Sequence, residues 1–279
     1  MILAHRGDSF HAPENTLEAA RLGYEAGADG WELDVQLTRD RIPVVLHDES
    51  LGRTTDVARK FSGDPRMASG FQVADFTLDE IKSLDAGSWF VDPSGGARSA
   101  TGFGTLARLD SKARTRYASG LVRIPTLAEA LELTKSLDWA VNVEIKPSMG
   151  QRNSLVDAVL GAIRTSSTED RVTVSSFDHE TVRSVAKLEP GVATGALVLD
   201  GAIPDGDSLV EGVGAEALHA PFEAILLGKI KVVNRPLLTY TVNTSGLSGP
   251  ILGLAAMGVM GIFTDDPAGL IRSMALNRS

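Results

Sequence analysis

The sequence predicts an α/β fold, a somewhat irregular TIM-type (β/α)8 barrel, from three observations. The chain has 279 residues, a usual length for such a barrel and enough to bury a sizeable core. Short β-rich runs recur along it, and most alternate with helical patterns, which is typical of parallel βα units. Such a barrel has eight strands, so at least one of nine candidate runs is accessory or wrong. The runs are residues 2–5, 31–37, 42–47, 140–145, 172–177, 194–199, 217–220, 237–242 and 261–264.

The helical stretches between these runs carry start signals. Three segments match a capping box or its Asn variant: 15–18, 77–80 and 126–129. Asn15 is therefore expected to cap the first helix. Asp178 is expected to cap a helix over 180–188, and Gly191 follows that stretch where a helix stop belongs.

Two features interrupt the regular alternation. The runs 31–37 and 42–47 lie too close together for a crossover helix, so they form either an antiparallel excursion or an irregular part of the barrel. Strand patterns then disappear across residues 51–122, and the piece 94–104 is loop-like. We expect one domain, residues 1–279, with 51–122 as an insertion on the catalytic face, because long insertions in barrels often shape the active-site mouth.

Composition excludes several classes of protein. A net charge of −9 argues against nucleic acid as a partner, since phosphate backbones favour a basic surface. The absence of cysteine excludes a thiol nucleophile, an iron–sulfur cluster, a thiolate zinc site and disulfides. No basic segment precedes a long apolar core at the N-terminus, and the uncharged stretch 236–264 is broken by polar residues and proline. We expect a cytoplasmic monomer or homodimer without a stable membrane anchor.

Carboxylates stand inside two of the predicted strands. Glu32 and Asp34 are two residues apart, so they share one face of their strand. Glu144 and Lys146 share a face of another strand. A bare buried charge is very unfavourable, so such carboxylates need a partner. Since the strand ends of a barrel gather at one face, three converging carboxylates would form an oxygen-rich site for Mg²⁺ or Ca²⁺.

Two histidines also end predicted strands. His5 is followed by Arg6, and His47 closes the third run. Each feature has an ordinary explanation by itself: a structural histidine, a solvent-facing Glu-x-Asp pair, or a simple ion pair between Glu144 and Lys146. All of them at strand ends would require several coincidences, so we interpret them as one catalytic site.

The sequence resembles the glycerophosphodiester phosphodiesterase family. The matching motifs run in the family's order across essentially the whole chain, and their combination is highly specific. They are AHRG at 4–7, APENT at 12–16, ELDVQLT at 32–38, PVVLHD at 43–48, RTT at 53–55, LDAGSWF at 84–90, IPTLAEAL at 124–131, NVEIK at 142–146, SSF at 175–177, TVN at 241–243 and GIFTDDP at 261–267.

The resemblance implies roles for the matching side chains. His5 and His47 match a general acid–base pair, in which one histidine activates the nucleophile and the other protonates the leaving group. The implied ligands of one divalent cation, Mg²⁺ or Ca²⁺, are Glu32, Asp34 and Glu144. The implied substrate-binding groups are Arg6 and Lys146 on the phosphate, with Phe177 and Tyr240 as aromatic contacts.

Three further residues are expected behind these groups. Glu14 would orient Arg6 or a histidine, and Asn15 lies beside it in the same motif. Arg53 would either reach the phosphate or anchor its loop. One departure from the family pattern is Tyr240, which stands where tryptophan is common, so an altered aromatic wall is expected.

The implied activity is metal-dependent hydrolysis of a small glycerophosphodiester to an alcohol and glycerol 3-phosphate. By family analogy the neighbouring glycerol hydroxyl attacks first, giving a cyclic phosphate that water opens.

Alternatives are lysophospholipase D-type cleavage of a bulkier lipid, a non-catalytic phosphodiester-binding protein, and a metal hydrolase of phosphate-free substrates. The last would not need Arg6 and Lys146 together. For the lipid alternative, an apolar strip in the insertion would either accept an acyl chain or pack internally: Phe61, Met67, Phe71, Val73 and Phe76.

Overall fold

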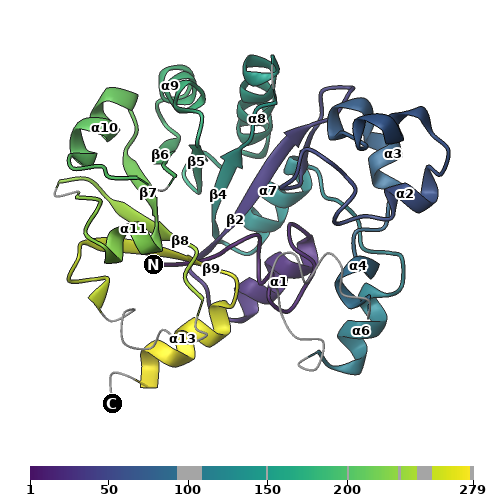
Figure 1. The fold of residues 1–279 in the computed structure, drawn as a ribbon, viewed down its shortest axis with the longest axis horizontal. Helices are drawn as coiled ribbons and strands as arrows, with labels where there is room; N and C mark the ends of the chain where they lie inside the picture. Colours follow the sequence, from purple (N-terminus) through teal and green to yellow (C-terminus); the bar gives the residue numbers. More distant parts are fainter. Residues whose placement is uncertain (93–108, 149, 200, 232–233, 244–252, 277–279) are drawn as a thin grey trace.

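Eight parallel strands close into a barrel in this chain (Figure 1). A computed structural model describes residues 1–92, 109–148, 150–199, 201–231, 234–243 and 253–276. Barrel strands pair in the order β1-β9-β8-β7-β6-β5-β4-β2, and an additional β1–β2 pairing closes the sheet. The strands are β1 (Ile2–Ala4), β2 (Gly30–Leu37), β4 (Ala140–Ile145), β5 (Val172–Ser176), β6 (Ala193–Leu197), β7 (Ala217–Pro221), β8 (Leu237–Tyr240) and β9 (Val259–Thr264). The predicted TIM-type barrel is confirmed.

The extra run among the nine predicted, residues 42–47, is the accessory strand β3 (Pro43–Val45). It pairs antiparallel with the far end of β2, with Leu37 opposite Pro43 and Val35 opposite Val45. The backbone N–H of Leu46 then donates to the carbonyl of Asp34 at 2.9 Å. The close pair of runs is therefore the antiparallel excursion. It returns the chain to the barrel rim just before His47.

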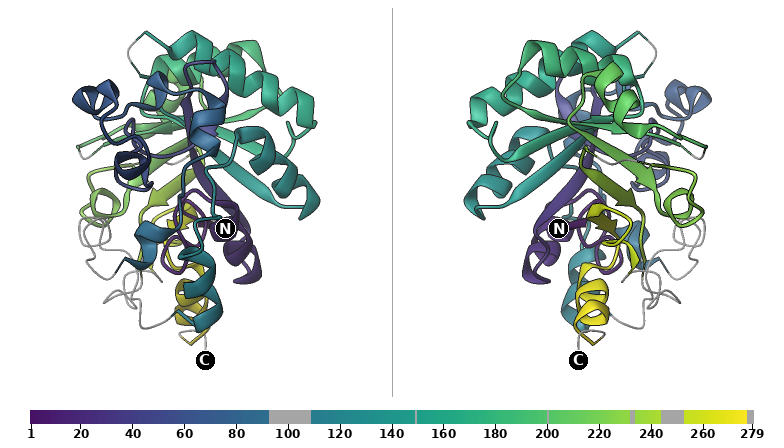
Figure 2. Two further views of the ribbon diagram at one scale, coloured as in Figure 1. Left: turned by 90° about the vertical axis from the view of Figure 1, so that its right-hand side faces the viewer. Right: turned by 90° about the vertical axis from the view of Figure 1, so that its left-hand side faces the viewer.

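Helices cover the outside of the barrel, as the side views in Figure 2 show. Those that follow the barrel strands are α1 (Leu17–Glu25), α7 (Leu127–Ser136), α8 (Arg152–Ser166), α9 (His179–Leu188), α10 (Gly206–Val213), α11 (Phe222–Leu226) and α13 (Pro267–Leu276). Along β2 the apolar residues Trp31, Leu33 and Val35 belong to the core shared with α7 and α8. Since side chains alternate along a strand, Glu32 and Asp34 face the barrel interior.

Most predicted helix starts are confirmed, and one is wrong. Complete capping boxes begin at Thr77 and Thr126, and Asp178 caps α9. The cap of α1 is Thr16, whose side chain accepts from the Ala19 N–H, and not Asn15. Asn15 has a φ of 58°, in the left-handed region, and its side chain serves another purpose described below.

The segment between β3 and α7 contains short helices beside α1 and α7 (Figure 1). They are α2 (Val57–Lys60), the 3-10 helices η1 (Pro65–Ser69) and η2 (Val73–Asp75), α3 (Leu78–Lys82), α4 (Ser88–Val91) and α6 (Ser111–Tyr117). Phe71, Val73 and Phe76 are buried there, in an apolar cluster that includes Ala12 and Ala19 from the α1 region. The apolar strip is therefore mainly internal packing. Residues 94–104 lie outside the described residues.

Within the described part of the chain, no helix is both long enough and apolar enough to cross a membrane. The uncharged stretch 236–264 contains β8 and β9 instead, as its predicted strands required. Its middle part, 244–252, lies outside the description.

Candidate active site

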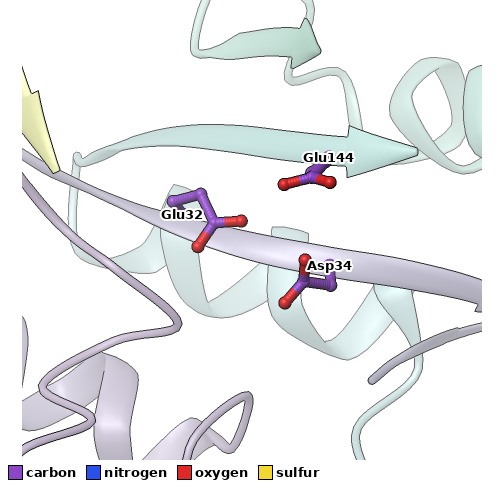
Figure 3. Close-up of side chains that lie close together, drawn as sticks. All are labelled: Glu32, Asp34 and Glu144. Carbon is purple, nitrogen blue, oxygen red and sulfur yellow. The ribbon is translucent and has the colours of Figure 1, made fainter. Parts of the chain in front are cut away.

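Three buried carboxylates meet inside the barrel between β2 and β4. Asp34 pairs in register with Glu144, and Glu32 lies two residues earlier on β2. One carboxylate oxygen from each residue lies within 4.8 Å of the other two, and Figure 3 shows the groups turned toward one another. Glu32 Oε1 and Asp34 Oδ1 make no hydrogen bond among the described residues. Buried carboxylate oxygens that lack a hydrogen bond fit the donor set of a hard divalent cation.

The pKa values of these carboxyls show how crowded the negative charge is. Burial and the nearby Asp34 and Glu144 charges raise the pKa of Glu32 to about 8. Burial and Asp34 likewise raise the pKa of Glu144. Burial alone would raise the pKa of Asp34, but Arg6 and Lys146 lower it. Bound protons and a bound cation are therefore alternatives at this site, since each relieves the same repulsion.

Two basic side chains border the carboxylates. Arg6 Nε lies 3.3 Å from Asp34 Oδ2, and Lys146 Nζ lies 3.3 Å from Asp34 Oδ1 and also contacts Glu144. A tight turn after β1 directs Arg6 inward: its φ is 56°, and its backbone N–H donates to Glu32 Oε2 at 2.9 Å. Gly7 follows with a φ of 81°, where a Cβ would lie 2.4 Å from the Ala19 backbone. Only glycine fits this close approach.

Each predicted catalytic histidine contacts an aspartate through Nδ1. His5 Nδ1 lies 2.6 Å from Asp265 Oδ1, and its Nε2 lies 3.9 Å from Glu32 Oε2. His47 Nδ1 lies 2.6 Å from Asp48 Oδ1. A carboxylate on Nδ1 fixes the ring orientation and leaves Nε2 for proton transfer. Burial and Arg6 lower the pKa of His5, but Asp265 and Glu32 outweigh them and raise it.

Asp265 is itself held by neighbouring groups at the end of β9. Asn243 donates from Nδ2 to Asp265 Oδ2 at 2.6 Å and accepts the Asp265 backbone N–H at 3.0 Å. The Ser9 hydroxyl donates to Asp265 Oδ1 at 3.1 Å. These contacts fix the carboxylate that orients His5.

A chain of ion pairs connects Arg6 to His47. Glu14, a buried residue, accepts from Arg6 at 2.9 Å and from two nitrogens of Arg53 at 2.8 Å. Arg53 also donates from Nε to Asp48 Oδ2 at 2.6 Å, and Asp48 contacts His47. Burial would raise the pKa of Glu14, but the two guanidinium groups lower it. Arg53 therefore lies behind the site, as a support for Asp48 and Glu14.

Asn15 orients Asp34 with both ends of its amide. Its Nδ2 donates to Asp34 Oδ2 at 2.8 Å, and its Oδ1 accepts the Asp34 backbone N–H at 3.1 Å. The backbone N–H of Asn15 also donates to the Arg6 carbonyl at 3.0 Å. The left-handed conformation of Asn15 is compatible with its residue type and is fixed by these contacts.

The histidines, basic groups and two carboxylates line one pocket with a volume of about 230 Å³. Phe177 and Tyr240 form part of its wall, with ring centroids 6.0 Å apart in an edge-to-face contact. No described residue of 51–122 lines this pocket, so a direct role of the insertion in its mouth stays a prediction. The lining residues are His5, Arg6, Glu32, His47, Asn142, Glu144, Lys146, Ser175, Phe177, Leu197, His219, Tyr240, Thr241 and Phe263.

Comparison with known proteins identifies the family. The model of the glycerophosphoryl diester phosphodiesterase family matches residues 5–269. The chain belongs to this family. A glycerophosphodiester phosphodiesterase of Caldanaerobacter subterraneus subsp. tengcongensis is 35% identical over 275 residues, which cover 97% of this chain and 96% of that protein. Another, from Bacillus altitudinis, is 31% identical, with 95% of this chain and 94% of that protein covered.

Solved structures of glycerophosphodiester phosphodiesterases share the fold. A phosphodiesterase of Oleispira antarctica, solved with its product sn-glycerol 3-phosphate, superposes with a TM-score of 0.76 at 28% identity, covering 99% of this chain and 96% of that one. The Thermotoga maritima glycerophosphodiester phosphodiesterase gives a TM-score of 0.63 at 25% identity, with coverages of 98% and 97%. The family and fold inferred from the sequence are thus confirmed.

Sequence reasoning missed several residues of this site. Asp48, Asn243 and Asp265 all lie within the motifs of the glycerophosphodiester phosphodiesterase resemblance, but no role was assigned to them. The signal for Asp48 is its position directly after His47. His219 lies in no recognised motif, and nothing local in the sequence distinguishes it.

Proposed function

We propose that this protein hydrolyses glycerophosphodiesters to an alcohol and glycerol 3-phosphate, with one divalent cation held by Glu32, Asp34 and Glu144. The observation that carries the proposal is the convergence on one pocket of this carboxylate group, two basic side chains and two His–Asp pairs. Membership of the family and the product bound to the Oleispira antarctica relative support the substrate class.

The cation, Mg²⁺ or Ca²⁺, would supply positive charge beside the non-bridging oxygens of the phosphate. Arg6 and Lys146 would hold the same oxygens from the protein side. Both lie 3.3 Å from Asp34 and line the pocket, so their positive charges stand beside the proposed cation ligands. Negative charge increases on these oxygens in the transition state, and charges fixed in advance stabilise it most effectively.

The histidines would move the protons. A hydroxyl is a weak nucleophile unless a base removes its proton, and an alkoxide is a poor leaving group unless an acid protonates it. His5 and His47 would each perform one of these tasks through Nε2, because Asp265 and Asp48 occupy the Nδ1 positions. We propose that the neighbouring glycerol hydroxyl attacks phosphorus and releases the alcohol as the first product. Water then opens the cyclic phosphate, with the two proton transfers reversed.

An assay on defined substrates tests this function. Glycerophosphocholine, glycerophosphoethanolamine and lysophosphatidylcholine are each incubated with Mg²⁺ or Ca²⁺, and released alcohol and phosphate ester are measured. We expect the protein to hydrolyse the two water-soluble diesters, glycerophosphocholine and glycerophosphoethanolamine. A metal chelator should abolish this turnover. Glu144→Gln is the matched control, since it retains the side-chain shape and removes a ligand charge. Failure of the wild-type protein to release glycerol 3-phosphate with either cation contradicts the proposal.

A further inference from the structure

A second group of polar side chains, on β4, β5 and β7, lines the same pocket as the candidate catalytic groups. Asn142 precedes Glu144 by two residues on β4, and Ser175 precedes Phe177 by two residues at the end of β5. Because the strands run toward the rim, each of these positions lies farther from the rim than the later residue on its own strand. In the register of the sheet, Asn142 pairs with Glu32 and Ser175 pairs with Glu144. His219 on β7 lines the same pocket. We call Asn142, Ser175 and His219 the polar floor.

Part of the hydrogen-bonding capacity of the polar floor is unused. His219 is fully buried, and neither ring nitrogen has a hydrogen-bond partner among the described residues. Asn142 donates from Nδ2 to the Ser175 hydroxyl at 2.8 Å, whereas its buried Oδ1 has no partner there. Buried polar atoms are nearly always paired, and an unpaired one costs roughly 1–3 kcal/mol. Three such atoms belong to residues that line one pocket, so a molecule bound there would have hydrogen-bonding groups to pair with.

The fold provides a specific place for the His219 ring. A Cβ on Gly195 would lie 2.5 Å from both Cε1 and Nε2 of this ring, so the absence of a side chain on β6 makes room for it. Phe263 on β9 contacts the ring, with centroids 5.3 Å apart. His219 is thus held between neighbouring strands at the pocket lining, with both ring nitrogens buried and without a hydrogen bond to a described residue.

The chemistry of the polar floor favours a hydroxyl over an anion. Burial lowers the pKa of His219 to about 4, so the ring is neutral near pH 7 and offers one donor and one acceptor. Asn142 Oδ1 is a further acceptor. A hydroxyl both donates and accepts, whereas a phosphate only accepts and is attracted to Arg6 and Lys146 at the other end of the pocket.

We propose that His219 and Asn142 bind a hydroxyl of the glycerol half of the substrate. This assignment rests on the proposed function for the identity of the substrate. The hydroxyl next to the phosphate ester is the one that attacks, so the terminal hydroxyl is free to reach the floor.

Binding measurements on His219→Phe test the assignment without relying on turnover. Isothermal titration calorimetry compares sn-glycerol 3-phosphate with methyl phosphate, which lacks both hydroxyls, in one Mg²⁺-containing buffer. We expect the variant to bind glycerol 3-phosphate about tenfold or more weakly, since one lost hydrogen bond of ~1.4 kcal/mol gives that factor, and to bind methyl phosphate as the wild type does. His219→Gln, which retains a donor and an acceptor, should recover part of the preference.

Two results would overturn the assignment: equal weakening for both ligands, or no weakening for glycerol 3-phosphate. If His219→Phe does not fold, Asn142→Leu removes an acceptor from the facing strand, and the same two results decide. Hydrolysis of glycerophosphocholine by the wild type is measured separately. Absent hydrolysis with an intact preference for glycerol 3-phosphate would contradict the proposed function alone, and hydrolysis without any such preference would contradict the polar floor alone.

Discussion

Asp265 and His5 are 260 positions apart in the chain, yet Asp265 Oδ1 lies 2.6 Å from His5 Nδ1. The pairing depends on barrel closure, because β1 and β9 are neighbouring strands and the His5 backbone N–H donates to the Thr264 carbonyl at 2.8 Å. The first and last strands of the barrel thus build one half of the proposed acid–base pair together.

Asp265→Asn should lower kcat by about a hundredfold, in the range expected when general acid–base catalysis is impaired. It should also move one limb of the pH–rate profile. Asp265 raises the pKa of His5, so its neutralisation shifts the limb due to His5 toward lower pH. Movement of the acidic limb would identify His5 as the base, and movement of the alkaline limb would identify it as the acid. A profile that keeps its shape would show that His5 does not limit the rate.

Arg53→Ala should lower the melting temperature as well as activity. The structure favours the anchoring role, because Arg53 bonds Glu14 and Asp48 and does not line the pocket. Removal leaves the buried Glu14 with Arg6 as its remaining cation among the described residues, and loss of one partner of a buried carboxylate is destabilising. Arg59→Ala is the matched control, since Arg59 is exposed and pairs only locally with Asp56. Loss of turnover at an unchanged melting temperature would instead favour direct contact with phosphate.

Cation affinity should increase with pH up to about pH 8. Glu32 has a pKa raised to about 8, so below that value a proton competes with the cation, and binding must release it. We expect affinity for Mg²⁺ or Ca²⁺ to fall by up to about tenfold per pH unit below this point, and calorimetry in buffers of different ionisation enthalpy should reveal proton release. Glu32→Gln should abolish both effects. Proton-independent binding by the wild type would contradict this role of Glu32.

His219 should make the protein sensitive to mild acid. Its folded-state pKa is about 4 and the unfolded value is about 6.5, so the unfolded chain takes up the proton first. The free energy of unfolding should therefore decline as pH falls from about 6.5 to 4, by at most ~3 kcal/mol from this residue. The difference in melting temperature between wild type and His219→Phe, measured at about pH 7 and pH 4.5, isolates the effect. A difference that does not change with pH would argue against a neutral buried ring.

The sequence predicted the barrel and the positions of the carboxylates because both depend on local periodicity. Glu32 and Asp34 interrupt an apolar strand at alternate positions, and parallel strand ends necessarily gather at one face. The cap of α1 could not be predicted in the same way. Asn15 and Thr16 are both good capping residues, and the contact of Asn15 with Asp34, which decides between them, is tertiary.

Partners that are distant in the chain were also beyond sequence reasoning. Nothing local connects Asp265 to His5, and the role of His219 depends on the space left by Gly195 on the neighbouring strand. In the insertion, Phe71 and Phe76 were expected either to accept an acyl chain or to pack internally, because composition does not reveal which side of a short segment is covered. The structure shows them buried.

The two histidines differ in how firmly the fold holds them. His5 directly follows β1, whose hydrogen bonds to β2 and β9 complete the ring of strands. His47 follows β3, which lies outside that ring. Opening a peripheral strand requires less free energy than opening a closed sheet. Heat or denaturant should therefore displace His47 and abolish activity while the barrel is still folded. Loss of activity would then precede loss of the global circular dichroism signal.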